Sequence, residues 1–209
     1  MTVLSYLAAI AIGYLLGSFP SGYVVGRLRG IDVRQWGSGR IGGTNVLRSV
    51  GPGAAILAVL SDVAKGVLAV FVARALVGSP SAEALAGLAA ILGHDFSIFL
   101  TFSGGRGVAT TLGALGALYL PASLILALLG LLVLAVSRYA SLASLTIATL
   151  MPFAMLYLVL FAGKPVWYLI YGLAASILIV VLHKGNIQRL LAGTERKIGE
   201  KGGRREGVP

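Results

Sequence analysis

The stretch Gly107–Ser137 reads GVATTLGALGALYLPASLILALLGLLVLAVS and contains no charged side chain. Its 31 residues are too many for one ordinary membrane span of about 20 residues and too few for two full spans with a loop. Pro121 lies near its middle, and Arg106 and Arg138 flank it. Both arginines can be cytoplasmic only if the chain crosses the membrane an even number of times between them. The stretch therefore predicts two short helices.

The composition of the whole chain is that of a membrane protein. Of its 209 residues, 57% are hydrophobic and 11% are charged, with a mean hydropathy of +0.93. A soluble domain carries about a quarter charged residues. At about 20 residues per span, the length allows roughly seven or eight helices and excludes a large domain outside the membrane. We therefore predict an all-α, polytopic membrane protein with short loops.

Cysteine is absent, and His94 and His183 are the only histidines. Without cysteine, disulfides, thiolate metal sites and cysteine nucleophiles are excluded. A metal site built on histidines would need carboxylates to complete it, and the seven acidic residues are scattered along the chain. We therefore expect no metal ion.

The net charge of +10 is concentrated in two polar segments. They hold 12 of the 17 basic residues, namely Arg27, Arg29, Arg34, Arg40, Arg48, Lys184, Arg189, Arg196, Lys197, Lys201, Arg204 and Arg205. In so apolar a chain, this clustering is typical of the positive charges of cytoplasmic loops rather than of nucleic-acid binding. Both segments are predicted to be cytoplasmic, and no nucleic-acid partner is expected.

Seven spans are predicted, with the N-terminus outside and the C-terminus in the cytoplasm. They comprise residues 1–26, 54–77, 83–100, two helices within 107–137, 139–163 and 165–182. No basic residue precedes Arg27, so the first span lacks the positive start of a cleaved signal peptide. Asp62 and Lys65, three residues apart in the second span, can pair. Residues 1–201 are predicted to form one domain, and residues 202–209 a flexible basic tail.

The first candidate site lies in the glycine-rich segment 27–53, which is predicted to be a cytoplasmic loop. Gly37, Gly39 and Gly42 fit G-x-G-x-x-G, but no strand precedes them, so a dinucleotide-binding fold is not indicated. The hydroxyl, amide, guanidinium and glycine N–H groups of this loop suit an oxyanion such as phosphate: Ser38, Gly39, Arg40, Thr44, Asn45 and Arg48. The alternative is a flexible loop whose arginines reach the lipid headgroups.

The second candidate site combines His94 with the run Gly104, Gly105, Arg106 and Gly107. A helix is predicted to begin at Val108, and the N–H groups and positive dipole end of a helix N-terminus favour anions. His94 lies in the final turns of the preceding predicted helix, 83–100. It is either a general base beside the anion site or a hydrogen-bonding residue of the helix interface.

Two further polar groups lie near the predicted cytoplasmic face. Ser141 and Ser144 are one helical turn apart at the start of a span, where serines commonly bond backbone carbonyls instead of a ligand. His183, Asn186 and Arg189 follow each other at three-residue intervals as the last span ends. A terminal arginine is expected at such a place, whereas a histidine and an asparagine one turn apart point to binding.

Together, these motifs resemble the bacterial acyl-phosphate:glycerol-3-phosphate acyltransferases of the inner membrane. The matching segments are 38–48, 93–94 with 104–110, 138–144 and 183–193, in the family's order. The resemblance implies transfer of a fatty acyl group from acyl phosphate to the 1-hydroxyl of sn-glycerol 3-phosphate, which gives lysophosphatidic acid and phosphate for phospholipid synthesis. It implies no metal or organic cofactor.

The chain departs from the family's usual residues at six positions. The family usually has Asn at Arg40, Ala at Gly43, Pro at Ser97, Lys at Ser103, Lys at Arg106 and Glu at Gly185. Arg106 keeps the positive charge of the usual lysine and adds bidentate geometry, so a phosphate-binding role remains.

The chemistry of this transfer matches the polar groups found in the sequence. Both substrates carry phosphate, and the two glycine-rich segments with Arg48 and Arg106 offer two anion sites. His94 is the expected residue to orient or deprotonate the acceptor hydroxyl, and a substrate phosphate oxygen is the alternative base. N–H groups near Gly104 and Gly105 are candidates to stabilise the tetrahedral oxyanion. A small transporter of phosphate or an organic phosphate is the competing hypothesis, although no internal repeat supports it.

Overall fold

The computed structural model describes residues 2–200 and 203–204. Most of the predicted flexible tail, 202–209, therefore lies outside the described residues. The helical elements are α1 (Val3–Ser18), α2 (Ser21–Arg27), η1 (Val33–Gln35), α3 (Gly43–Ser49), α4 (Pro52–Leu76), α5 (Pro80–Asp95), η2 (Ile98–Leu100), α6 (Val108–Ser137), α7 (Ala140–Phe161), α8 (Val166–Leu182) and α9 (Lys184–Leu191).

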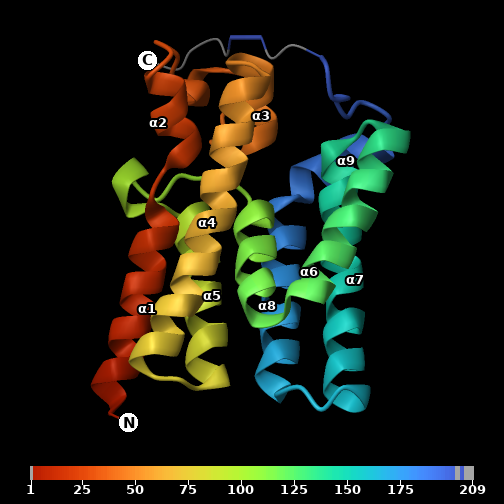
Figure 1. Ribbon diagram of the computed structural model, residues 1–209. Coiled ribbons are helices and arrows are strands. Elements are labelled where there is room, and N and C mark those ends of the chain that lie inside the picture. The colour runs from red at the N-terminus through yellow and green to blue at the C-terminus, as the bar shows by residue number, and fades with distance from the viewer. Residues whose placement is uncertain (1, 201–202, 205–209) are drawn as a thin grey trace.

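The long helices pack side by side, and the short polar elements gather at one end (Figure 1). In this view α2, α3 and α9 lie at the top, while the α4–α5 and α7–α8 connections lie at the bottom. Among the described residues, five segments are long and apolar enough to cross a membrane, or six if the bent pair α8–α9 is counted as one span. The protein is therefore a multi-pass membrane protein.

Local sequence signals explain where several helices begin. Thr2 caps α1 by accepting from the Ser5 N–H, and Ser79 caps α5 by accepting from the Ala82 N–H. Pro52 and Pro80 each occupy the first helical position, where a missing N–H costs nothing. The helix predicted from Val108 begins at that residue. The sequence therefore predicts where these helices begin.

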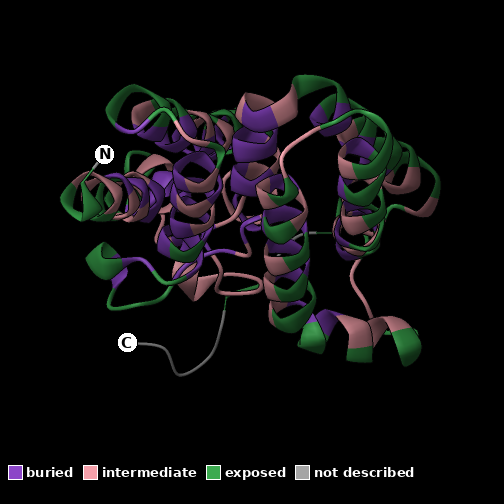
Figure 2. Cartoon of the chain, turned by 90° about the horizontal axis from the view of Figure 1, so that it is seen from below, coloured by how far each residue is buried: buried purple, intermediate pink, exposed green. Residues whose placement is uncertain are grey.

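Small residues let the helices approach closely. A Cβ at Gly13 or Gly17 of α1 would overlap the α5 backbone, and one at Gly66 or Gly113 would overlap at the α4–α6 contact. Such contacts are typical of membrane helices, where packing rather than water expulsion drives association. Buried residues lie toward the interior of the bundle and exposed ones on its outside (Figure 2). The outward apolar surface is the one that lipid would cover.

Helix α6 consists of two arms joined at a kink at Tyr119, whose φ and ψ are −157° and 96°. Pro121 has no N–H, so it cannot bond the carbonyl of Ala117 four residues earlier. Arg74 of α4 donates to that carbonyl instead, at 2.8 Å. The first arm runs downward in Figure 1 and the second returns to the top. The break lies two residues before Pro121, close to where the sequence predicts one.

Three expectations from the sequence need correction. The first predicted span is interrupted at Phe19–Pro20, because Pro20 cannot continue the backbone ladder of α1. The segment 27–53, predicted as a loop, contains η1 and α3. His183, Asn186 and Arg189, predicted where the last span ends, lie at and beyond a bend of 59° between α8 and α9 and so do not continue the axis of α8.

Candidate active site

A single cavity of about 760 Å³ runs from the polar end of the bundle down between α4 and the two arms of α6. Thirteen residues predicted for the site line it: Ser38, Arg40, Thr44, Asn45, Arg48, His94, Gly105, Arg106, Gly107, Ser141, Ser144, His183 and Asn186. Gly39 and Gly104 lie outside its lining. The four separated motifs therefore converge on one site.

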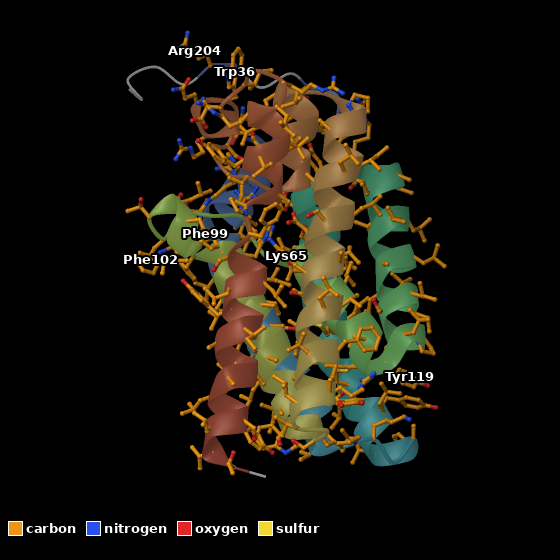
Figure 3. All side chains as sticks on the ribbon, turned by 60° about the vertical axis from the view of Figure 1, so that its left-hand side comes forward. Trp36, Lys65, Phe99, Phe102, Tyr119 and Arg204 are labelled. Carbon is orange, nitrogen blue, oxygen red and sulfur yellow. The ribbon has the colours of Figure 1, made fainter. Side chains whose placement is uncertain are left out.

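His94 belongs to a buried group of polar side chains at the polar end of the cavity. Its Nδ1 lies 2.7 Å from Lys65 Nζ and 3.3 Å from Asp62 Oδ1. Lys65 and Asp62 form the ion pair predicted from their spacing, with Nζ and Oδ1 3.0 Å apart. Ser21 donates to the same Asp62 oxygen, and Lys65 also donates to the Phe19 carbonyl at the α1–α2 break. Figure 3 shows Lys65 near the middle of the bundle.

The shorter of the two contacts favours one protonation state of the His94 ring. The ammonium of Lys65, which is ion-paired with Asp62, has only N–H donors, so Nδ1 of His94 accepts from Lys65 at 2.7 Å in preference to donating to Asp62 Oδ1 at 3.3 Å. The proton of the neutral imidazole then resides on Nε2. That atom faces Gly105, because a Cβ added at Gly105 would overlap the ring at Nε2. His94 thus presents an N–H donor toward the loop that follows α5.

The glycine run packs against His94 so closely that side chains are excluded. A Cβ at Gly104 would overlap the backbone of His94 and Asp95, and Gly107 has a φ of +67°. The Gly105 N–H donates to the His94 carbonyl at 3.0 Å, so it is not free to stabilise an oxyanion, contrary to the sequence-based expectation. The N–H groups of the first turn of α6, after Gly107, lack intrahelical partners and remain suitable donors.

The basic side chains at the cavity form a cluster without enough counter-charge. Burial, with Arg40 and Arg189 nearby, lowers the pKa of Arg106 to about 10. Burial and Arg196 likewise lower the pKa of Arg48. Nε of Arg48 and Nε of Arg106 are buried with no hydrogen-bond partner in the described structure. Both groups remain charged at neutral pH, so an anion that enters the cavity relieves repulsion and supplies acceptors.

One carboxylate already occupies part of this site. Glu195 Oε1 accepts from Ser141 Oγ at 2.8 Å and from Asn186 Nδ2 at 2.6 Å, and Oε2 accepts from Arg189 Nε at 2.7 Å. Burial tends to raise the pKa of Glu195, but these hydrogen bonds outweigh burial and the pKa lies below its ordinary value. Ser141 and Asn186 can therefore hold an anionic oxygen, because they hold one here.

The match to known proteins extends over nearly the whole chain. A family model described as glycerol-3-phosphate acyltransferase matches residues 7–193. The chain belongs to the glycerol-3-phosphate acyltransferase family. Glycerol-3-phosphate acyltransferases of Synechococcus sp. strain CC9902 and Moorella thermoacetica are 46% and 49% identical to it, over 96% and 94% of this chain and 98% and 99% of their own lengths.

Solved structures of this acyltransferase family have the same fold. PlsY (YgiH), an integral membrane glycerol 3-phosphate acyltransferase, is 38% identical in its glycerol 3-phosphate form, with a TM-score of 0.85. Its lysophosphatidic acid form is 37% identical, with a TM-score of 0.83. Each alignment covers 93% of this chain and 96% of that chain. Membership of this family does not favour the transporter hypothesis.

Several predicted acyltransferase site residues are engaged with the protein itself. Asn45 donates to the carbonyls of Val33, Trp36 and Arg40 and accepts from the Ser38 N–H, so its side chain organises the first loop. Ser144 donates to the Ala140 carbonyl at 2.9 Å. His183 Nδ1 lies 2.8 Å from the Ile179 carbonyl and must donate to it, which leaves Nε2 as an acceptor.

Two parts of the site were missed in the sequence. The pairing of Asp62 with Lys65 was predicted, but not their contact with His94, which depends on how α4 and α5 pack. Glu195 was missed because it follows α9 and joins two residues of that helix, Asn186 and Arg189, to Ser141 of α7. Its position six residues after Arg189 offers at most a weak sequence signal for one of these contacts.

Proposed function

We propose that this chain transfers a fatty acyl group from acyl phosphate to the 1-hydroxyl of sn-glycerol 3-phosphate at the cytoplasmic face of the bacterial inner membrane. The products are lysophosphatidic acid and inorganic phosphate. The observation that carries this proposal is the two-part cavity. Arg40, Arg48 and Arg106 line its polar end, and apolar side chains of α4 and α6 line the rest. That division suits an amphiphile with a phosphate head and a hydrocarbon chain.

The relatives support the acceptor and the product. The solved PlsY structures are named for glycerol 3-phosphate and lysophosphatidic acid. For this chain, both phosphate groups would bind the guanidinium cluster and the free N–H groups at the start of α6. Ser38, Thr44, Ser141, Asn186 and His183 line the same polar end and are proposed to complete the two sites.

The donor is proposed to be acyl phosphate because the polar elements are small. An acyl-CoA donor needs room for adenosine and pantetheine, and an acyl-carrier-protein donor needs a docking surface. A phosphate leaving group needs only N–H groups and one or two cations. The mixed anhydride is already activated, so no covalent acyl-enzyme is required.

In the proposed reaction, the acceptor hydroxyl oxygen bonds to the carbonyl carbon of acyl phosphate. The carbon–oxygen bond to phosphate then breaks, and the hydroxyl proton leaves on a phosphate oxygen. His94 presents Nε2–H to this region, so it is better placed to donate a hydrogen bond than to accept the proton. We therefore assign His94 to orientation and charge stabilisation, and a substrate phosphate to the role of base.

We further propose seven membrane crossings, with the N-terminus outside and the basic C-terminal segment in the cytoplasm. The opposite directions of the two arms of α6 support two crossings there (Figure 1). The basic segments gather at the end of the bundle that holds the cavity mouth. Single cysteines replacing Gln35 or Glu200 should react with an impermeant thiol reagent only after the cells are opened. Labelling in intact cells would contradict this topology.

The proposal is tested with purified protein, glycerol 3-phosphate and a series of acyl phosphates whose chains range from dodecanoyl to octadecanoyl. Lysophosphatidic acid and phosphate should appear in equal amounts, without added metal or cofactor. If no lysophosphatidic acid forms and the reconstituted protein instead moves glycerol 3-phosphate or phosphate into vesicles, the transporter hypothesis replaces this one.

A further inference from the structure

The apolar part of the cavity has a definite lower end. Val59, Val63, Val67 and Phe71 of α4 line it at four-residue intervals, so they share one face of that helix. Its other walls come from the two arms of α6, including Leu112, Leu120, Leu124 and Leu131, and from Ile147 of α7. Among the described residues of α4, Phe71 is the last that lines the cavity, and Leu120 marks the same end on α6.

The depth of the cavity corresponds to the length of one lipid acyl chain. Asp62, beside His94, and Phe71 both line the cavity and are nine residues apart, which is about 14 Å of helix at about 1.5 Å per residue. Half of a hydrocarbon core of about 30 Å is about 15 Å, the depth that the acyl chains of one leaflet fill. In Figure 3, Tyr119 at the kink lies below Lys65, which is near the middle of the bundle. An acyl chain entering from the polar end therefore reaches Phe71.

Contacts of Arg74 hold the residues at the lower end of the cavity in place. The Arg74 guanidinium lies 5.2 Å from the centre of the Phe71 ring and donates to the Ala117 carbonyl at 2.8 Å. The same guanidinium pairs with both Glu83 oxygens, at 2.6 and 3.0 Å. Because the Ala117 carbonyl lacks a helical partner at Pro121, Arg74 ties the kink of α6 to α4. Phe71 is thus held beside the kink of α6 at the lower end of the cavity lining.

We propose that Phe71, held by Arg74, sets the upper limit on the length of the acyl chain that this enzyme transfers. The inference rests on the proposed acyltransferase function and adds a determinant of donor specificity. The donor comes from lipid, so each methylene gains little by moving into an apolar cavity. Discrimination must instead come from overpacking against the Phe71 ring. The enzyme should reject donors that are too long more sharply than donors that are too short.

The experiment compares kcat/KM of the full-length protein for hexadecanoyl and octadecanoyl phosphate. Phe71→Ala opens the lower end and should raise the octadecanoyl-to-hexadecanoyl ratio at least fivefold, which is about 1 kcal/mol. Phe71→Trp fills it further and should lower the same ratio. Leu68→Ala is the matched control, since Leu68 is 50% exposed on the same helix, near the 48% of Phe71, and lies outside the cavity lining. It should leave the ratio unchanged.

Arg74 is tested separately as a positioning residue. Arg74→Met removes the bond to the Ala117 carbonyl and should weaken the discrimination against octadecanoyl phosphate. Arg74→Lys retains an N–H donor and should restore part of it, which a general loss of folded protein would not do. Active Phe71→Ala and Phe71→Trp enzymes that both keep the wild-type ratio would overturn the proposal. A wild-type enzyme that acylates nothing would instead overturn the proposed function itself.

Discussion

Nζ of Lys65 lies 2.7 Å from Nδ1 of His94, and this contact places the imidazole proton on Nε2. We therefore expect His94→Gln, which keeps an N–H near the position of Nε2, to retain much more activity than His94→Ala. His94→Ala should lower kcat about a hundredfold with little change in KM, as expected for a donor that acts mainly on the transition state. Steady-state kinetics of the two variants make the comparison. Equal, severe losses in both would restore the general-base interpretation.

The guanidinium cluster should account for much of the phosphate affinity. Arg106→Ala should reduce kcat/KM about tenfold to a hundredfold, because a hydrogen bond to a charged group contributes about 1.5–3 kcal/mol. Arg106→Lys should lose less, since the family usually has lysine there. Arg29→Ala is the control, because Arg29 is exposed in the same basic segment and does not line the cavity. The account of the polar end would be wrong if Arg29→Ala and Arg106→Ala had the same effect.

The contact between Gly105 and His94 leaves no room for a side chain. Gly105→Ala should therefore displace the imidazole and lower kcat at least tenfold. Gly53→Ala is a control in the first turn of α4, where an added Cβ meets no atom within 4 Å. It should keep full activity and be neutral or slightly stabilising, because alanine favours a helix more than glycine does. Full activity in Gly105→Ala would show that the position of the ring does not matter.

Glu195 should make the stability of the protein sensitive to acid. Its pKa in the folded protein is lowered, so its stabilising contribution is present above the unfolded pKa near 4.3 and is lost as the pH falls through the folded pKa. Glu195→Gln should lower Tm at neutral pH and should flatten the decline of Tm on the acid side. Thermal unfolding in detergent between pH 3 and about 7 measures both effects. A variant whose Tm falls with acid as steeply as the wild type would contradict this assignment.

Much of the fold follows from short-range patterns. The charge-free stretch between Arg106 and Arg138 indicated a break near Pro121, and the kink occurs at Tyr119. The spacing of Asp62 and Lys65 was enough to predict their ion pair. The glycine-rich segments indicated an anion site, and their residues line one cavity. Each of these patterns depends on neighbours within a few turns of the chain.

The remaining features depend on tertiary packing and could not be predicted. The tautomer of His94 is set by Lys65 from another helix, and the depth of the cavity is set by Phe71 and Arg74 against the kink of α6. The amide of Asn45 is of a type that can bind an anion, but it donates to carbonyl groups of the surrounding loop. Its partners lie five to twelve residues earlier in the chain, and their spacing does not predict the contacts.

The most direct test of the account is a comparison of donors in one assay. Purified protein receives glycerol 3-phosphate with hexadecanoyl phosphate, hexadecanoyl-CoA or the hexadecanoyl carrier protein, and lysophosphatidic acid is measured. The account predicts product from acyl phosphate, inhibition by inorganic phosphate, and no appreciable rate with the other two donors. Comparable turnover with hexadecanoyl-CoA would contradict it.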